Sequence, residues 1–168
     1  MLMKKIYLAG PDVFEPDAIS VGEELKKLAS EYGFVGLFPL DNVISTQGTS
    51  HEVARVIRDA NIKLIESADI VMANLNPFRG IEPDSGTVFE VGFATARGKE
   101  VYCYAADCRE MIARIREKQQ LGDSATLCQD GKTIEDFQLS HNLMMIDQVV
   151  AVDAASCLAY IKKQQGKN

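Results

Sequence analysis

Short runs of apolar, often branched residues alternate along this chain with segments whose apolar residues recur at helical spacing. This alternation constrains the fold most, because it is typical of repeated strand–helix–strand units with parallel strands. The run DIVMANL at 69–75 is apolar almost throughout, so we expect a strand that is buried on both faces. The expected strands cover residues 5–10, 34–40, 69–75, 100–105 and 148–153. The expected helices cover residues 17–33, 50–68, 107–120 and 154–164, with a further helix that begins at Gly86 or Thr87.

The length of the chain predicts a single domain over residues 1–168. A chain of 168 residues can bury a core but is too short for two ordinary domains. We find no internal repeat, low-complexity tract or interdomain linker in it. The pattern therefore predicts an α/β fold, a single doubly wound five-stranded parallel sheet of flavodoxin-like (Rossmann-like) order, with helices on both faces.

Composition excludes several classes of partner. The formal net charge of -6 and the pI near 5.0 argue against nucleic acid, whose binding depends on clustered Lys and Arg. The longest apolar runs are only strand-length and the first ten residues do not resemble a signal peptide, so we expect no membrane partner and a cytoplasmic location.

Metal and dinucleotide sites are also disfavoured. The cysteines form no CxxC pair and few histidines accompany them, so we expect reduced thiols and no metal site. These residues are Cys103, Cys108, Cys128, Cys157, His51 and His141. The first loop, AGPDVFEPD, has one glycine where a dinucleotide fingerprint needs three, and no GxxxxGK[ST] motif occurs.

The segment PFRGIEPDSGTVFEVGFATARGK, residues 77–99, carries the densest unusual chemistry. It follows the third expected strand, and ligands of open α/β sheets bind beyond the carboxyl ends of strands. We expect Glu90 in or just after the first turn of the helix, where the dipole stabilises a carboxylate by roughly 0.3–1 kcal/mol. Helix geometry alone favours that dipole role. Asp84, six residues earlier with the small Gly86 between, adds a second carboxylate, and such pairs can divide the roles in glycosyl chemistry.

Four separated blocks of the chain resemble the nucleoside 2-deoxyribosyltransferase family. They are IYLAGPDVF at 6–14, DANIKLIESADIVMANLNPFRG at 59–80, PDSGTVFEVGFATARGK at 83–99 and HNLMM at 141–145. The resemblance implies a doubly wound α/β enzyme of nucleotide salvage that exchanges the base of a 2'-deoxyribonucleoside for another free nucleobase. The exchange proceeds with retention through a covalent deoxyribosyl-glutamate, needs no cofactor, and becomes hydrolysis when water replaces the acceptor base.

The resemblance implies a role for each matching residue. Glu90 matches the nucleophile that attacks C1' of the sugar, and Tyr7 matches a tyrosine whose hydroxyl orients it. Asp84 matches an aspartate that binds the hydroxyl end of the deoxyribose. Asp59 matches an aspartate near the base that is proposed to handle its proton. Three further candidates for substrate binding are Gly10, Phe14 and Phe78, of which the two phenylalanines are candidates for stacking on the base.

The resemblance also implies a homo-oligomer, a dimer or a trimer of dimers, with shared active sites. Asn142, with Met144 behind it, matches an asparagine that a neighbouring subunit supplies to close the sugar pocket.

Each residue has a simpler alternative when it is read alone. Tyr7 is otherwise a half-buried strand aromatic, Asp59 a solvated helix residue and Asn142 a helix N-cap. Arg79 is a candidate partner of Glu82 or Asp84, with simple solvation as its alternative.

Two other functions compete with base exchange. The first is hydrolysis of 2'-deoxynucleoside 5'-monophosphates by relatives on the same fold. It is disfavoured because Asp84 would face a phosphate of like charge. The second is a non-catalytic nucleotide-sensing module, which the intact set of site residues argues against. The PFRG and PDSGT stretches of the loop slightly favour purines as the bases.

Overall fold

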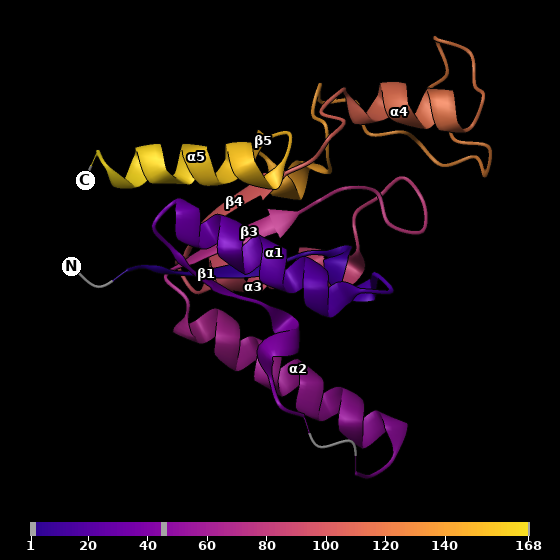
Figure 1. The fold of residues 1–168 in the computed structure, drawn as a ribbon. Coiled ribbons are helices and arrows are strands. Elements are labelled where there is room, and N and C mark those ends of the chain that lie inside the picture. The colour runs from indigo at the N-terminus through magenta and orange to yellow at the C-terminus, as the bar shows by residue number, and fades with distance from the viewer. Residues whose placement is uncertain (1–2, 45–46, 168) are drawn as a thin grey trace.

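The computed structural model describes residues 3–44 and 47–167, and its strands form one parallel sheet (Figure 1). Within these residues the sheet has five strands in the order β2-β1-β3-β4-β5, which is the flavodoxin-like order that the sequence predicts. The strands are β1 Lys5–Ala9, β2 Val35–Leu37, β3 Ile70–Asn74, β4 Glu100–Tyr104 and β5 Val149–Ala151. All five residues of β3 are buried, so the prediction of a strand covered on both faces is confirmed.

Helices cover both faces of the sheet, as Figure 1 shows. They are α1 Ala18–Glu31, α2 Ser50–Ser67, α3 Ser85–Ala96, α4 Met111–Lys118 and α5 Ala154–Gln165. One core cluster joins α2 and α3 to one face of the sheet through Ile65, Val91 and Ala94. A second cluster joins α1 and α5 to the opposite face through Ala29, Leu158 and Ile161. Helix α4 stands apart from the sheet.

Alternation along β1 decides which side chains reach each layer. Ile6 and Leu8 belong to the cluster beneath α1 and α5, whereas Tyr7 and Ala9 belong to the cluster beneath α2 and α3. Successive side chains of a strand point to opposite faces, so this division follows from the pleat. The tyrosine of the first strand therefore lies on the same side of the sheet as the helix that carries Glu90.

Local chemistry moves three element ends from their predicted positions. Helix α3 begins at Ser85, because the Asp84 carboxylate accepts the Thr87 backbone N–H at 2.9 Å and caps the helix. Strand β2 ends at Leu37, before Pro39 opens a short 3₁₀ turn. Helix α4 begins four residues later than the sequence predicts, because the Asp107 side chain accepts the Arg109 backbone N–H in a turn.

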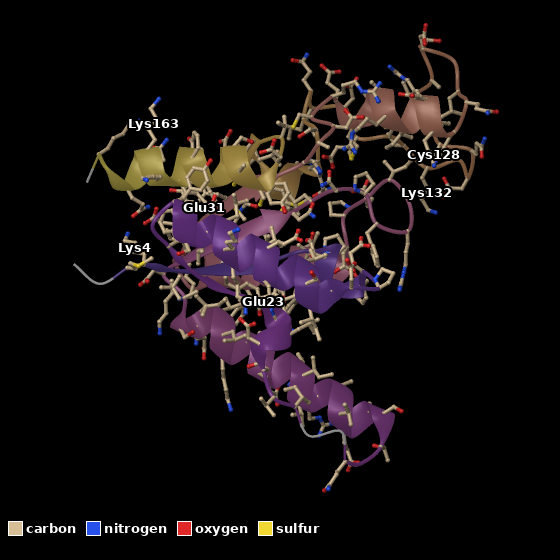
Figure 2. The ribbon with its side chains drawn as sticks, in the orientation of Figure 1. Lys4, Glu23, Glu31, Cys128, Lys132 and Lys163 are labelled. Atoms are coloured by element: carbon tan, nitrogen blue, oxygen red, sulfur yellow. The ribbon has the colours of Figure 1, made fainter. Side chains whose placement is uncertain are left out.

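The stretch after α4 packs a small satellite core against that helix. The core contains Met111, Ile112, Ile115 and Ile134, with Cys128 packed at its edge. Figure 2 shows Cys128 and Lys132 close to α4, away from the sheet. All four cysteines are free.

Two negative findings concern the described part of the chain. Over residues 3–44 and 47–167, no helix combines the length and apolar character needed to cross a membrane. Over the same residues, no group of three or more His, Cys, Asp or Glu side chains is arranged to hold a metal ion.

Candidate active site

Tyr7 and Glu90 meet in the layer between the sheet and helices α2 and α3. The Tyr7 hydroxyl donates a hydrogen bond of 2.6 Å to Glu90 Oε1. Tyr7 is 0% exposed, so the expectation of a half-buried aromatic is wrong. The reason is that β1 is an inner strand, where Tyr7 pairs with Leu37 of β2 and Val71 of β3. The hydroxyl is therefore positioned by the sheet.

Glu90 lies deeper in its helix than the sequence predicts. Helix α3 runs from Ser85, which puts Glu90 in its second turn, beyond the free N–H groups of the first turn. Burial raises the pKa of Glu90 to about 7, with a further increase from Asp84 and an opposing decrease from the Tyr7 hydrogen bond. Burial therefore favours the protonated form of Glu90, in contrast to the stabilised carboxylate expected at the start of the helix.

Tyr7 remains a proton donor in this pair. Burial, and then the neighbouring Glu90 charge, raise the pKa of Tyr7 well above its ordinary value. The phenol therefore keeps its proton at neutral pH, and its hydroxyl donates a hydrogen bond to an ionised Glu90. The pair acts as an acceptor carboxylate with a fixed donor.

Asp84 combines a structural role with a charge close to Glu90. Its Oδ2 accepts hydrogen bonds from the Thr87 backbone N–H at 2.9 Å and from Thr87 Oγ1 at 3.1 Å. A Cβ atom added at Gly86 would lie 3.0 Å from that oxygen, so glycine leaves the carboxylate unobstructed. The negative charge of Asp84 also raises the pKa of Glu90, less than burial does.

A cavity of about 310 Å³ lies between α2 and α3 and includes Glu90. This volume is in the range of small-ligand sites. Its lining residues are Ala54, Ile57, Arg58, Asn61, Ile62, Ile65, Gly86, Phe89 and Glu90. Sequence reasoning missed Arg58 and Asn61. The signal for them was present, because they share the helical spacing of the fully buried Ile65.

Asp59 is not brought together with Glu90. It lines a separate cavity of about 600 Å³, together with Asn42 and Lys63. It lies two positions before Asn61, which is a rotation of about 200° around an α-helix. Its Oδ1 accepts hydrogen bonds from Arg58 Nε at 3.0 Å and Arg58 Nη2 at 2.6 Å. Asp59 therefore touches the Glu90 cavity only through Arg58.

Phe14 and Phe78 stack on each other at the carboxyl edge of the sheet. Their ring centroids are 4.9 Å apart, with an interplanar angle of 20°. The Arg79 guanidinium lies over both rings, at 5.4 Å from the Phe14 centroid and 4.6 Å from the Phe78 centroid. Neither ring lines the Glu90 cavity. Among the described residues, Arg79 makes this contact instead of an ion pair with Glu82 or Asp84.

Gly10 is required by close packing at the end of β1. A Cβ atom at this position would lie 2.3 Å from Asp12 Oδ2 and 2.8 Å from Asn74 Cβ. The same two neighbours are joined by a hydrogen bond of 3.0 Å from Asn74 Nδ2 to Asp12 Oδ2. This bond ties the first loop to the end of β3, and sequence reasoning did not single it out.

Asn142 and Met144 also lie outside the Glu90 cavity of this chain. Asn142 Oδ1 accepts the Met144 backbone N–H at 3.1 Å and caps the 3₁₀ turn Leu143–Met145, as its simpler alternative predicts. Its Nδ2 donates to Glu135 Oε2 at 3.0 Å. The Met144 side chain is 80% exposed. One chain therefore does not bring these two residues to its own Glu90.

The chain is similar to known proteins over most of its length. The sequence model described as nucleoside 2-deoxyribosyltransferase matches residues 6–144. The solved structure of a 2-deoxyribosyltransferase from Leishmania mexicana is 34% identical, with a TM-score of 0.75, and the match covers 95% of this chain and 97% of that one. A 2-deoxyribosyltransferase from Bacillus psychrosaccharolyticus is 18% identical with a TM-score of 0.57, covers 94% and 90% respectively, and shows the shared fold alone.

A curated relative from Schizosaccharomyces pombe, an uncharacterized protein, is 32% identical over 124 residues. The match covers 71% of this chain and 59% of the relative, so the chain spans about three fifths of that relative's length.

Proposed function

Because this chain belongs to the nucleoside 2-deoxyribosyltransferase family, we propose that it transfers the 2-deoxyribosyl group of a 2'-deoxyribonucleoside from one nucleobase to another. One observation carries the proposal: a largely buried Glu90 carboxylate, hydrogen-bonded to the Tyr7 hydroxyl at 2.6 Å, opens into a cavity between α2 and α3. A carboxylate at such a position is suited to attack a sugar carbon and to stabilise the positive charge that develops there.

The proposed reaction has two displacements at one carbon. Glu90 attacks C1' from the face opposite the base; a C1'–O bond forms, the glycosidic C1'–N bond breaks, and its electron pair leaves with the base. A second base then attacks C1' from the face that the first base left. The ester C1'–O bond breaks and Glu90 is regenerated as a carboxylate, so the configuration is retained. The first base takes up a proton as it leaves and the second base gives up its N–H proton as it attacks, so protons balance over the cycle. Water in place of the second base gives hydrolysis.

The proposed nucleophile has to lose its proton before it attacks. Burial raises the pKa of Glu90 to about 7, so this carboxyl is partly protonated at neutral pH. The hydrogen bond from Tyr7 favours the ionised form and fixes which oxygen is held by the phenol. The other carboxylate oxygen is then free to attack.

On the base side of the cavity, we propose that Arg58 and Asn61 contact the nucleobase. A guanidinium stabilises the negative charge that develops on a leaving base, and an amide can bond a ring edge. The role of Asp59 in handling the proton stays a prediction, and Asp59 lines a separate cavity from Glu90. Arg58 cannot relay a proton between Asp59 and the base, because guanidinium stays protonated in proteins.

We propose that Asp84 binds the hydroxyl end of the sugar, which favours nucleosides over their 5'-monophosphates. A phosphate at that end would place nearly two negative charges beside Asp84, and like charges in a partly buried site repel strongly. The proposed substrates are therefore 2'-deoxyribonucleosides and free nucleobases, with purines slightly favoured.

The decisive experiment supplies deoxyinosine with and without free adenine and measures deoxyadenosine by chromatography. We expect deoxyadenosine only when protein and adenine are both present. Glu90→Ala should lower the rate by about a thousandfold or more, because the nucleophile is removed. Glu24→Ala is the matched control, since Glu24 is an exposed residue of α1. Equal rates for the wild-type protein and Glu90→Ala would overturn the mechanism.

A covalent-labelling experiment separates this enzyme from a non-catalytic sensing module. The protein is incubated with deoxyinosine alone, quenched in acid and digested. We expect a 2-deoxyribosyl adduct on the peptide that contains Glu90. Binding of deoxyinosine without any adduct and without turnover would favour the sensing module instead.

A further inference from the structure

Arg114 of α4 is a buried cation without a bonded counter-charge. The side chain is only 7% exposed, and its Nε atom has no hydrogen-bond partner. Within residues 3–44 and 47–167 its one hydrogen bond runs from Nη2 to the backbone carbonyl of Ser140, and no carboxylate pairs with it. Burial of an unpaired charge is costly, so this guanidinium is suited to bind an anion.

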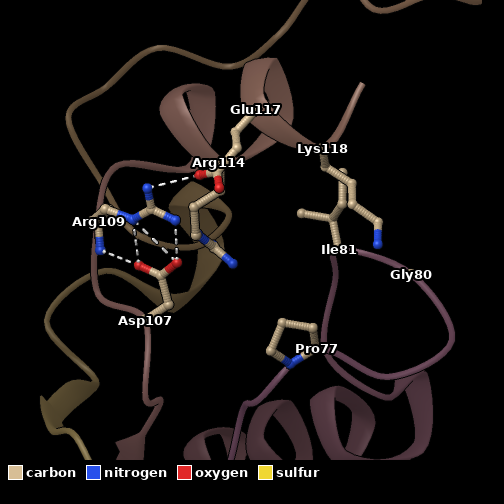
Figure 3. A pocket seen from close by; sticks show the side chains of 8 residues that line it. All are labelled: Pro77, Gly80, Ile81, Asp107, Arg109, Arg114, Glu117 and Lys118. Carbon is tan, nitrogen blue, oxygen red and sulfur yellow. Dashed lines mark hydrogen bonds and ion pairs between the residues drawn. The ribbon is translucent and has the colours of Figure 1, made fainter. Parts of the chain in front are cut away.

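The Arg114 side chain lines a cavity of about 230 Å³ between the 77–81 loop and α4 (Figure 3). The lining residues are Pro77, Gly80, Ile81, Asp107, Arg109, Arg114, Glu117 and Lys118. Figure 3 shows Lys118 beside Ile81, on the side of the cavity opposite Asp107. The Lys118 side chain is exposed and, within the described part of the chain, makes no hydrogen bond or ion pair. The cavity therefore holds two cations with donors to spare.

The two acidic residues of the cavity are already occupied by a third cation. Arg109 Nη2 pairs with Asp107 at 2.7 Å, and Arg109 Nη1 pairs with Glu117 at 2.7 Å. The hydrogen bonds from Arg109 lower the pKa of Asp107 to about 2, so this carboxylate is ionised and engaged. Three positive side chains thus face two negative ones, in a chain whose net charge is -6. The Arg114 charge also acts on Asp107, and one positive charge remains in excess among the three cations.

We propose that this cavity binds a phosphate group, held by Arg114 and Lys118. Guanidinium offers a planar fork of donors that suits phosphate oxygens, and a lysine ammonium adds a point charge. A cavity of this size holds a tetrahedral anion with room for the molecule attached to it. The group belongs either to inorganic phosphate or to a small phosphate monoester, and the experiment below separates these sources.

The site is distinct from the Glu90 cavity but shares a loop with the candidate active site. The two cavities have no lining residue in common. Pro77, Gly80 and Ile81 nevertheless lie in the loop that leads from β3 to Asp84, and Phe78 and Arg79 of that loop stack with Phe14. An anion bound between α4 and this loop would therefore contact the loop through Pro77, Gly80 and Ile81.

Isothermal titration calorimetry with inorganic phosphate tests the proposal, in the absence of nucleoside. We expect saturable binding to the wild-type protein. Lys118→Gln should raise the Kd by about tenfold or more, because a hydrogen bond to a charged group is lost. Arg114→Met should abolish binding, with its fold checked by circular dichroism because Arg114 also holds Ser140. Lys118→Gln keeps the test decisive if Arg114→Met does not fold.

Two controls separate this site from general charge effects and from catalysis. Lys27→Gln removes an exposed lysine of α1 and should leave the Kd unchanged. Glu90→Ala should also leave it unchanged, so phosphate binding is independent of the proposed transferase activity. Absence of saturable binding, equal weakening by Lys118→Gln and Lys27→Gln, or competition between phosphate and deoxyinosine would each overturn the proposal.

Titrations with 2-deoxyribose 5-phosphate and with deoxyadenosine 5'-monophosphate identify the source of the phosphate group. Tighter binding of a monoester than of inorganic phosphate, with the same dependence on Lys118, assigns the cavity to that monoester. Equal or weaker binding of both monoesters assigns it to the free ion.

Discussion

At the scale of single residues, Glu90 is subject to opposing influences that set its acidity. Burial raises its pKa, the Tyr7 hydroxyl lowers it, and the Asp84 charge raises it again. The balance near 7 leaves a carboxylate that is less hydrated than an exposed one and still ionised in part of the molecules. A nucleophile of this kind is sensitive both to pH and to each of its two polar neighbours.

Tyr7→Phe should move the pH dependence of base exchange. The substitution deletes the hydrogen bond that lowers the pKa of Glu90, so the acid limb of kcat/KM should shift above the wild-type value of about 7. The rate should also fall by about tenfold or more, because a hydrogen bond to a charged group is lost. Profiles of kcat/KM against pH for the wild-type protein and Tyr7→Phe measure both the shift and the lower rate. Tyr102→Phe is a matched control, since Tyr102 donates to Glu100 at 2.8 Å outside the site. If the acid limb of the profile is unchanged in Tyr7→Phe as well as in Tyr102→Phe, Tyr7 does not lower the pKa of Glu90.

Glu90→Gln should change the pH dependence of stability. The pKa of Glu90 is raised from 4.5 in the unfolded chain to about 7 in the folded one, so its contribution is fully present below 4.5 and is lost as pH rises through 7. Wild type should therefore lose up to about 3 kcal/mol relative to Glu90→Gln between acid and mildly alkaline pH. Urea denaturation across that range measures the difference. A constant difference between the two proteins would count against the raised pKa.

At the scale of elements, α3 depends on Asp84 twice, as a cap and as a charge. Asp84→Ala should destabilise the protein by about 1 kcal/mol, because the Thr87 N–H loses its acceptor. Asp84→Asn should keep the cap and the stability but remove the charge, which lowers the pKa of Glu90. Thermal melts and pH–rate profiles of the two variants separate these effects. Equal melting temperatures for Asp84→Ala and Asp84→Asn would show that the cap contributes nothing.

The elements also show how much the sequence predicts. Strand β3 and helices α1, α2 and α5 were predicted within a few residues, because burial on a sheet or a helix face leaves a periodic pattern in the sequence. The pair Tyr7 and Glu90 followed only from the family resemblance. The two residues lie 83 positions apart, and local patterns do not show which strand a helix covers.

The remaining differences have physical causes that one segment does not reveal. The helix turn in which Glu90 lies is set by where α3 begins, and Asp84 fixes that start as the cap. The pKa of Glu90 depends on its burial between the helices and the sheet. Choosing Asn61 instead of Asp59 for the cavity requires the rotation of α2 against α3. That rotation is set by packing around Ile65.

At the scale of the whole molecule, mixing two inactive variants tests whether each active site is shared between two subunits. Glu90→Ala and Asn142→Ala should each be inactive alone. If Asn142 of one subunit completes the Glu90 site of another, unfolding and refolding the two variants together creates mixed dimers with one intact site. About a quarter of wild-type activity should return, as expected for random pairing in a two-fold dimer. Activity that stays at the level of the separate variants would show that each site belongs to one chain.

The position of Tyr7 in the middle of the sheet has a consequence for how such a protein can diversify. The hydroxyl that holds Glu90 is placed by β1 and its paired neighbours, whereas the residues proposed to meet the base and the sugar end lie on α2 and on the 77–84 loop. Changes of length or composition in those outer segments alter which molecules fit without moving the reacting pair. Substitutions in α2 and the 77–84 loop can therefore change the range of substrates while Tyr7 and Glu90 keep their positions.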